Sequence, residues 1–162
     1  MEYHLAQVNI AKMLADLNAP VMSDFVQRLN EINLLADSSA GFVWRFLSDE
    51  GDATYLRPYE DKNILFNMSV WESLESLKAY VYNSSHLELL KSKKNWFSKL
   101  SEPHMALWWV PKGHIPSVSE GLRKINIIKE RGACEEAFTF AEPYGPNTQL
   151  DKDAPKSGAP DS

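Results

Sequence analysis

The chain of 162 residues has a single cysteine, Cys134, and no surplus of basic side chains. One cysteine can form neither an internal disulfide nor a cysteine-based metal site, which is typical of a reducing, cytoplasmic setting. With 17 Lys and Arg against 22 Asp and Glu, the formal net charge is −5, and nucleic-acid binders normally show the opposite balance. No apolar run approaches the roughly 18 residues of a membrane span, and the first residues lack the basic and apolar regions of a signal peptide. We therefore expect a cytoplasmic protein with neither a nucleic-acid nor a membrane partner.

Aromatic residues are abundant by contrast, with five Trp, six Tyr and seven Phe. An apolar fraction of 44% and a charged fraction of 24% are typical of a globular domain. The composition changes at residue 141, after which Pro and Asp are frequent and apolar side chains are few. Such a segment buries too little apolar surface to offset its ordering entropy. The sequence predicts a folded domain over residues 1–140 and a disordered polar tail over 141–162.

Hydrophobic periodicity predicts the order of the elements. Alternation predicts strands over residues 4–10, 42–47, 64–71 and 104–110, with a short edge strand over 137–140. Helical spacing predicts helices over 20–37, 73–82 and 84–100. A capping box formed by Ser117 and Glu120 starts a further helix that ends at Gly132. Residues 48–61 are polar, contain Gly51 and Pro58, and are expected to form a loop.

This order, β-α-β-β-α-β followed by an extra helix and strand, predicts an α+β protein of the ferredoxin-like type. Its antiparallel sheet would carry the two crossover helices on one face. The sequence places apolar side chains on both faces, one of them including Leu5, Trp71 and Leu107. If the even-numbered set that contains Val8 faces the helices, the face with Leu5 is left bare. Exposed apolar area of that size is unfavourable, so we expect a homodimer whose sheets pack face to face as a dimeric α/β barrel.

Polar side chains interrupt the apolar pattern on the face expected to point into the barrel: Gln7, Asn9, Arg45, Asn67 and Ser69. Mostly apolar walls with a few convergent polar groups are typical of a small-molecule pocket. A buried Arg45 requires an acid or an anionic ligand as its partner. The alternative is that Arg45 lies at the strand end and reaches solvent. Trp71, Trp96 and Trp109 are candidates to line the pocket around a flat aromatic ligand, or else belong to the core.

His86, near the start of the expected helix over 84–100, is a candidate general base or haem ligand, since an imidazole titrates near neutrality and binds metals. Its alternative is a structural histidine that caps or packs locally. The sequence contains no His-x-His, His-Glu-x-x-His or spaced Cys/His pattern, so we expect no metal site.

Several segments form a distinctive series: HLAQVN (residues 4–9), MSVWES (68–73), YNSSH (82–86), NWF (95–97) and LWWVPKGH (107–114). Over roughly residues 3–140 the chain resembles an uncharacterised bacterial family, a domain of unknown function (DUF), in the dimeric α/β-barrel superfamily. This superfamily is related in fold to antibiotic-biosynthesis-type monooxygenases. The resemblance implies the fold and the dimer, and it brings no established activity.

The superfamily also includes haem-degrading monooxygenases and stress-response proteins. The haem-degrading branch uses an Asn on the first strand, a Trp on the third and a His on the following helix. Asn9, Trp71 and His86 have those residue types on those elements, although the separation between Trp71 and His86 is longer here.

The leading interpretation is a homodimer that binds a small, flat, largely apolar molecule, with or without catalysis. In an enzyme that needs no cofactor, His86 or a neighbouring polar group would take a proton from a phenol-like substrate, and Arg45 or Asn67 would stabilise the oxyanion. Oxygen would then react with the bound carbanion. The alternatives are a haem-binding or haem-using barrel and a non-enzymatic ligand-binding or stress-response dimer.

Overall fold

The computed structural model describes residues 2–16, 18–46, 64–83 and 93–146, together with Leu87 and Lys91. The expected loop over 48–61, the candidate His86 and the expected tail from residue 147 onward lie outside the described residues. The described elements follow in chain order: β1 (Tyr3–Met13), η1 (Pro20–Met22), α1 (Ser23–Ser38), β2 (Phe42–Arg45), β3 (Ile64–Trp71), α2 (Leu74–Val81), η2 (Lys93–Asn95), β4 (Phe97–Ser98), β5 (Met105–Pro111) and α4 (Val118–Arg131).

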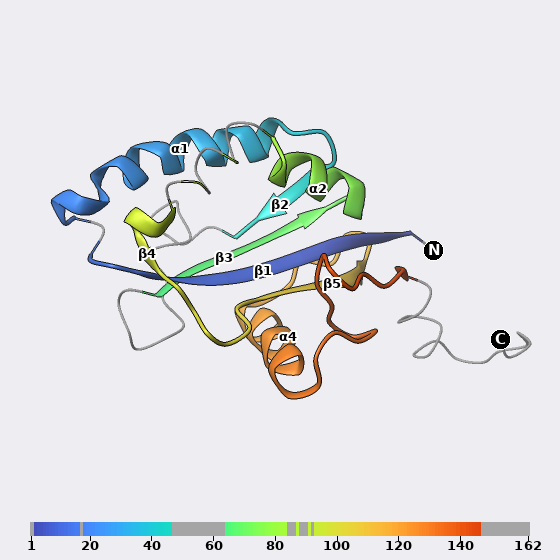
Figure 1. Cartoon of the computed structure of the whole chain (residues 1–162). Coiled ribbons are helices and arrows are strands. Elements are labelled where there is room, and N and C mark those ends of the chain that lie inside the picture. The colour runs from blue at the N-terminus through green and yellow to red at the C-terminus, as the bar shows by residue number, and fades with distance from the viewer. Residues whose placement is uncertain are drawn as a thin grey trace, which may run out of the picture.

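The strands form one antiparallel sheet with β1 at its centre (Figure 1). Strand β3 pairs with one edge of β1 and with β2, while β5 runs along the other edge of β1. Within the described ranges, strand β4 pairs with the end of β1, at Lys12 and Met13. The spatial order β2-β3-β1-β5 and the connections through α1 and α2 are those of a ferredoxin-like fold. The predicted α+β class and β-α-β-β-α-β order are confirmed.

Helices α1 and α2 lie over one face of the sheet (Figure 1). One apolar cluster on this face, which we call the inner cluster, joins sheet residues to both helices: Leu5, Ala36, Trp71, Leu77, Leu107, Trp109 and Phe138. A second, the end cluster, lies where β1 meets β4 and consists of Met13, Met22, Phe25 and Trp96. The helix-covered face therefore has two apolar regions.

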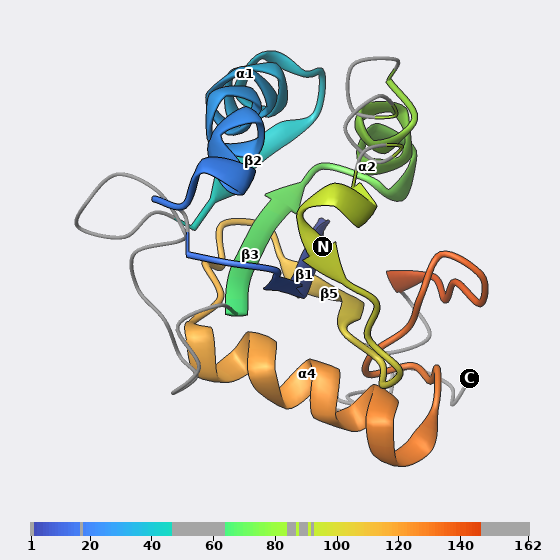
Figure 2. The same cartoon turned by 60° about the vertical axis from the view of Figure 1, so that its left-hand side comes forward.

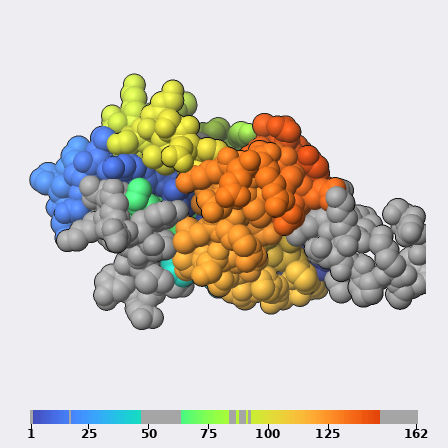
Figure 3. Space-filling model, turned by 90° about the horizontal axis from the view of Figure 1, so that it is seen from below, coloured from blue at the N-terminus to red at the C-terminus, as the bar shows by residue number. Residues whose placement is uncertain are grey.

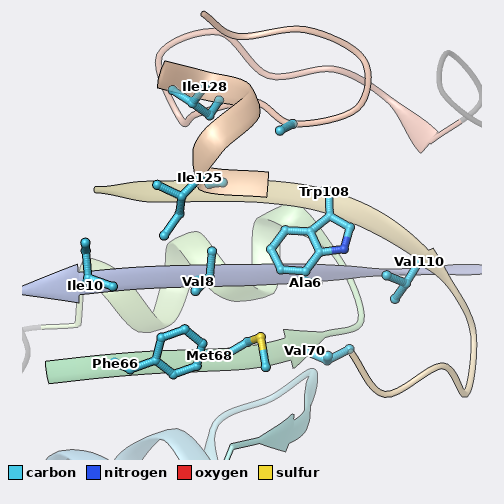
Figure 4. Close-up of a cluster of buried hydrophobic side chains, with 12 residues drawn as sticks. Ala6, Val8, Ile10, Phe66, Met68, Val70, Trp108, Val110, Ile125 and Ile128 are labelled. Atoms are coloured by element: carbon cyan, nitrogen blue, oxygen red, sulfur yellow. The ribbon is translucent and has the colours of Figure 1, made fainter. Parts of the chain in front are cut away.

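Helix α4 covers the opposite face, as Figures 2 and 3 show. Alternate strand residues pack there against Ile125 and Ile128 of α4 (Figure 4): Ala6, Val8, Ile10, Phe66, Met68, Val70, Ala106, Trp108 and Val110. Burial of each isoleucine stabilises the fold by roughly 2 kcal/mol. A Cβ atom at Gly121 would lie 2.9 Å from the Met68 sulfur and 3.3 Å from Val8 Cγ2, so the glycine lets α4 approach the sheet closely.

The start of α4 is anchored to the sheet by Glu120. The hydroxyl of Ser117 caps the helix by accepting the Glu120 backbone N–H at 3.1 Å, which is the Ser117 half of the predicted capping box. The Glu120 carboxylate accepts a 2.8 Å hydrogen bond from Trp108 Nε1 on β5, and its other oxygen lies 2.8 Å from His114 Nε2. Burial alone would raise the pKa of Glu120, but the hydrogen bonds from His114 and Trp108, together with the charges of His114 and Lys124, lower that pKa.

The prediction of a helix over residues 84–100 is wrong from residue 93 onward. This part forms the short helix η2 and then β4, where Phe97 pairs with Met13. The ring of Phe97 packs edge-on against Phe25 of α1 at 5.0 Å between centroids. Tertiary contacts with β1 and α1 therefore override the local helical spacing.

The arrangement of aromatic residues on β2 also differs from simple alternation. The register shifts between Phe42 and Trp44, so a bulge places these two residues in different clusters. Phe42 packs on Trp71 at 5.4 Å, while Trp44 and Phe46 pack against the α4 side of the sheet. An extra residue in one strand has this effect because it inverts the alternation beyond it.

The two sheet faces are exchanged relative to the expectation. The face with Leu5 and Trp71 lies under α1 and α2, and the face with Val8 lies under α4. The dimer was expected because one face seemed bare, and in the described structure the chain's own α4 covers the second face. The bare face therefore no longer supports the face-to-face homodimer, which stays a prediction.

The chain continues to pack against the domain beyond residue 140. The ring of Tyr144 lies 6.0 Å from that of Phe138, and the Tyr144 carbonyl accepts a 2.8 Å hydrogen bond from Trp109 Nε1. Residues 137–140 contribute two isolated bridges, from Phe138 to Leu107 and from Ala137 to Cys134, in place of the expected edge strand. No helix in the described ranges is long and apolar enough to cross a membrane.

We predict that Gly121→Val lowers the free energy of unfolding by about 1–3 kcal/mol, because the new side chain overpacks the contact with Val8 and Met68. Asn126→Val, at an exposed position of the same helix, is the matched control and should change stability far less. Chemical denaturation of the two variants measures the difference. Equal free energies of unfolding for the two variants would show that α4 does not pack closely against Val8 and Met68 at Gly121.

Candidate functional site

The register of three strands brings the predicted polar residues together. Arg45 on β2 lies opposite Ser69 on β3, which lies opposite Gln7 on β1. In the next row, Asn67 lies opposite Asn9. Because side chains two residues apart share a face, all five project toward the side covered by α1 and α2. We call these five residues the polar band.

A hydrogen-bond network holds the centre of the polar band. The Gln7 amide donates from Nε2 to Asn67 Oδ1 and to Ser69 Oγ, both at 2.8 Å. Ser69 Oγ also accepts a 2.9 Å hydrogen bond from Nε1 of Trp71. Gln7 and Ser69 are each only 7% exposed. The network satisfies polar groups that would otherwise be buried without partners.

Arg45 is paired with an acid of its own chain. Its Nε donates to Asp37 Oδ1 at 2.8 Å, and its Nη2 lies 3.4 Å from Asp37 Oδ2. The Arg45 side chain is 18% exposed. The structure thus supplies the acidic partner that a partly buried Arg45 requires, and the guanidinium contributes to the band as part of an ion pair.

Tyr80 of α2 closes one end of the polar band. Its ring stacks on Trp71 with 5.0 Å between centroids and 26° between planes. Burial raises the pKa of Tyr80 from 10.0 to about 12, against the opposing effect of Arg45 and with a further rise from Asp37. The phenol is therefore neutral across the physiological range.

Sequence reasoning missed both Asp37 and Tyr80. Asp37 is at the C-terminal end of α1, and nothing in its spacing from Arg45 indicates a contact before the fold is known. Tyr80 follows the buried Leu77 at a spacing of three, which places both on one face of α2. That spacing was the available signal for Tyr80.

The polar band opens to solvent at Asn9. This residue is exposed although it lies within the central strand, and its neighbour Asn67 is half-buried. The inner cluster lies on one side of the band and the end cluster on the other. Asn9 and Asn67 therefore form a polar, accessible place on a sheet face that is otherwise apolar.

The three candidate tryptophans occupy different positions. Trp71 touches the band through Ser69. Trp96 belongs to the end cluster, where its ring lies 5.6 Å from that of Phe25. Trp109 belongs to the inner cluster and is bonded to the carbonyl of Tyr144. Only Trp71 is held by the polar network, and a ligand role for the other two stays a prediction.

The residues present do not fit the haem set. Asn9 and Trp71 share a face, but Asn9 lies opposite Asn67, four residues or about 13 Å along β3 from Trp71. Trp71 is 1% exposed and is enclosed by Tyr80 and Ser69. His86 lies outside the described residues.

The histidines that the structure describes lie elsewhere. His4 alternates to the α4 side of the sheet. His104 precedes β5 and contacts the Glu102 carbonyl, and His114 bonds to Glu120. In the described part of the chain, no group of three or more His, Cys, Asp or Glu side chains is placed to hold a metal ion.

The chemistry available at the band is that of neutral amides and hydroxyls beside an internally paired charge. Such groups recognise hydrogen-bonding edges of a ligand and stabilise a developing oxyanion by donation. The carboxylate of Asp37 is engaged by Arg45.

We predict that Ser69→Ala destabilises the protein by about 1–3 kcal/mol, because it leaves the buried Trp71 N–H without its acceptor. The change should also alter the near-ultraviolet circular dichroism, since Trp71 loses its fixed orientation. Ser38→Ala is the control, because the Ser38 hydroxyl bonds only exposed carbonyls of its own helix. Equal effects of the two substitutions would contradict this prediction.

The raised pKa of Tyr80 predicts a loss of stability in alkali. Between pH 10 and about 12, Tyr80 is ionised in the unfolded chain but still protonated in the folded protein. The free energy of unfolding therefore falls as the pH rises. Tyr80→Phe should remove part of this loss. Tyr82→Phe, at a residue that is 61% exposed, should leave it unchanged. Urea denaturation as a function of pH measures the effect, and identical profiles would count against it.

Comparison with solved structures gives distant similarities over most of the domain. SnoaB, a cofactor-independent oxygenase from Streptomyces nogalater, is 14% identical, with a TM-score of 0.48 and coverage of 70% of this chain and 98% of its own. A protein from Chloroflexus aurantiacus J-10-fl, provisionally described as an antibiotic biosynthesis monooxygenase, is 15% identical, with a TM-score of 0.46 and coverage of 71% and 98%. A conserved protein from Methanosarcina mazei Go1 is 12% identical, with a TM-score of 0.48 and coverage of 67% and 92%.

No curated protein matches the chain. A family model does match, however, and it extends over residues 4–154. The resemblance noted in the sequence is thereby confirmed at the level of the family. This protein belongs to the family described as a domain of unknown function, DUF3291.

Proposed function

We propose that the protein binds a small, flat, largely apolar molecule on the face of the sheet under α1 and α2, over the polar band. The observation that carries this proposal is Asn9, an exposed polar residue within the central strand, beside the half-buried Asn67. A few polar groups set among apolar walls are the usual composition of a ligand site. Here the walls are the inner cluster and the end cluster.

The shape of the expected ligand follows from its surroundings. Cross-strand neighbours Leu107 and Met105 flank Gln7 and Asn9 on the β5 side. The sheet supports a planar molecule laid against it, and the stacked pair of Trp71 and Tyr80 offers an aromatic boundary. A flat ring system buries more apolar surface in this setting than a chain of the same size.

The charge of the expected ligand also follows. Arg45, the cation within the band, is paired with Asp37. The remaining groups of the band are neutral amides and a hydroxyl. A ligand carrying a full charge would lose hydration without gaining a free counter-charge among the described residues, so a neutral molecule is favoured.

We further propose that the protein oxygenates the bound molecule without a cofactor. A bound phenol-like substrate would lose a proton, and Asn67 would donate a hydrogen bond to the resulting oxyanion. The carbanion form would add O₂ to give a hydroperoxide, which eliminates water and leaves a carbonyl group. His86 is the proton acceptor expected from the sequence. Oxygen uptake with the substrate bound, measured in wild type and His86→Ala, separates this enzyme from a non-enzymatic binder.

We predict that coumarin, a flat neutral lactone, quenches the tryptophan fluorescence saturably, and that Trp71→Phe removes most of the quenching. Trp71 touches the polar band through Ser69, so its emission is the one that senses an occupant. Trp44→Phe, on the α4 side of the sheet, is the matched control and should keep the quenching. Circular dichroism verifies that both variants fold. Linear, non-saturable quenching in wild type, or quenching that persists in Trp71→Phe, would refute the site.

A further inference from the structure

Two amide side chains of the polar band have hydrogen-bonding atoms to spare. In the network, Gln7 uses Nε2 and Asn67 uses Oδ1. No described residue donates to Gln7 Oε1 or accepts from Asn67 Nδ2. An amide nitrogen and an amide oxygen thus remain available, one on each residue. We call them the donor–acceptor pair.

This conclusion does not depend on how the two amides are oriented. Rotation of both amides by half a turn keeps every contact: Ser69 would donate to Gln7 Oε1, and Asn67 Nδ2 would donate to the same oxygen. The spare atoms would then be Gln7 Nε2 and Asn67 Oδ1. Trp71 Nε1 donates to Ser69 Oγ in either case. One donor and one acceptor are left over in both arrangements.

The Asn67 member of the pair lies where a ligand can reach it. Asn67 is half-buried, and Asn9, directly opposite on β1, is exposed. Gln7, in contrast, is 7% exposed and is fixed by two hydrogen bonds. The pair is therefore held by the sheet at the open part of the polar band, with little conformational freedom to lose on binding.

We propose that this pair selects neutral planar ligands that carry a hydrogen-bond donor directly beside an acceptor, as a cyclic lactam does. The inference rests on the proposed function, because it specifies the class of ligand for the same site. A lactam N–H donates to the spare amide oxygen while its carbonyl accepts from the spare amide nitrogen. An isosteric lactone, which has a ring oxygen in place of the N–H, leaves the amide oxygen unpaired. A site built for a donor rejects the analogue that lacks it.

The test compares three planar probes on the full chain by isothermal titration calorimetry: quinolin-2(1H)-one, its lactone isostere coumarin, and naphthalene. The lactam should bind about tenfold tighter than coumarin or more. Asn67→Leu removes one member of the pair, so the lactam should lose about tenfold in affinity while naphthalene is little affected. Asn30→Leu, at an exposed position of α1, is the matched control and should leave all three affinities unchanged.

The outcomes separate the two proposals. If coumarin and quinolin-2(1H)-one bind with equal affinity to wild type, the donor–acceptor pair does not select the ligand, although the binding site stands. If none of the three probes binds, the proposed function itself fails. If the lactam preference persists in Asn67→Leu, the selection arises elsewhere in the molecule. If Asn67→Leu does not fold, the wild-type comparison still overturns the proposal when coumarin and quinolin-2(1H)-one bind with equal affinity.

Discussion

The pairing of β1 with β3 determines the rest of the molecule. Its register sets Gln7 opposite Ser69 and Val8 opposite Met68. The first pair directs polar atoms to the α1 and α2 side, and the second directs apolar side chains to α4. A slip of one residue would exchange the two faces of one strand and bury the amide groups against Ile125. The network at the polar band and the core under α4 are thus two consequences of one alignment.

Helix α4 changes what the second sheet face can do. A four-stranded ferredoxin-like sheet leaves this face open, and a partner molecule is one way to cover it. Here Gly121 lets α4 sit close to Val8 and Met68, and Trp108 is bonded to Glu120 at the helix start. Because α4 of the same chain covers this apolar face, the proposed ligand site rests on the polar band of the other face.

The sequence predicts much of this arrangement, for a physical reason. Alternation reveals which strand residues share a face, so the grouping of Gln7, Asn9, Arg45, Asn67 and Ser69 could be derived without coordinates. The bounds of β3 are those expected, and Ser117 and Gly132 delimit α4 as predicted. These features depend on local spacing and capping, which the sequence contains directly.

Other features depend on contacts between distant segments. Alternation of apolar residues divides a strand into two faces but does not indicate which face a helix covers. The prediction therefore placed the two crossover helices on the wrong face of the sheet. The helical spacing after residue 93 loses to pairing with Met13, a contact about 80 residues away along the chain. The same limit applies to Asp37 and Tyr80, whose roles arise only when α1 and α2 meet the sheet.

The candidate site follows from how polar groups are satisfied in a buried sheet. A folded protein pairs nearly all its buried donors and acceptors, and Gln7, Ser69 and Trp71 obey this rule among themselves. The amides of Gln7 and Asn67, however, have four hydrogen-bonding atoms between them, an oxygen and a nitrogen on each. Their mutual hydrogen bond uses one atom of each amide. The remainder must face water or a ligand. Because Asn9 opens that part of the sheet to solvent, the fold tolerates the unpaired atoms without a ligand, and a planar molecule that pairs with them replaces water at a place already prepared.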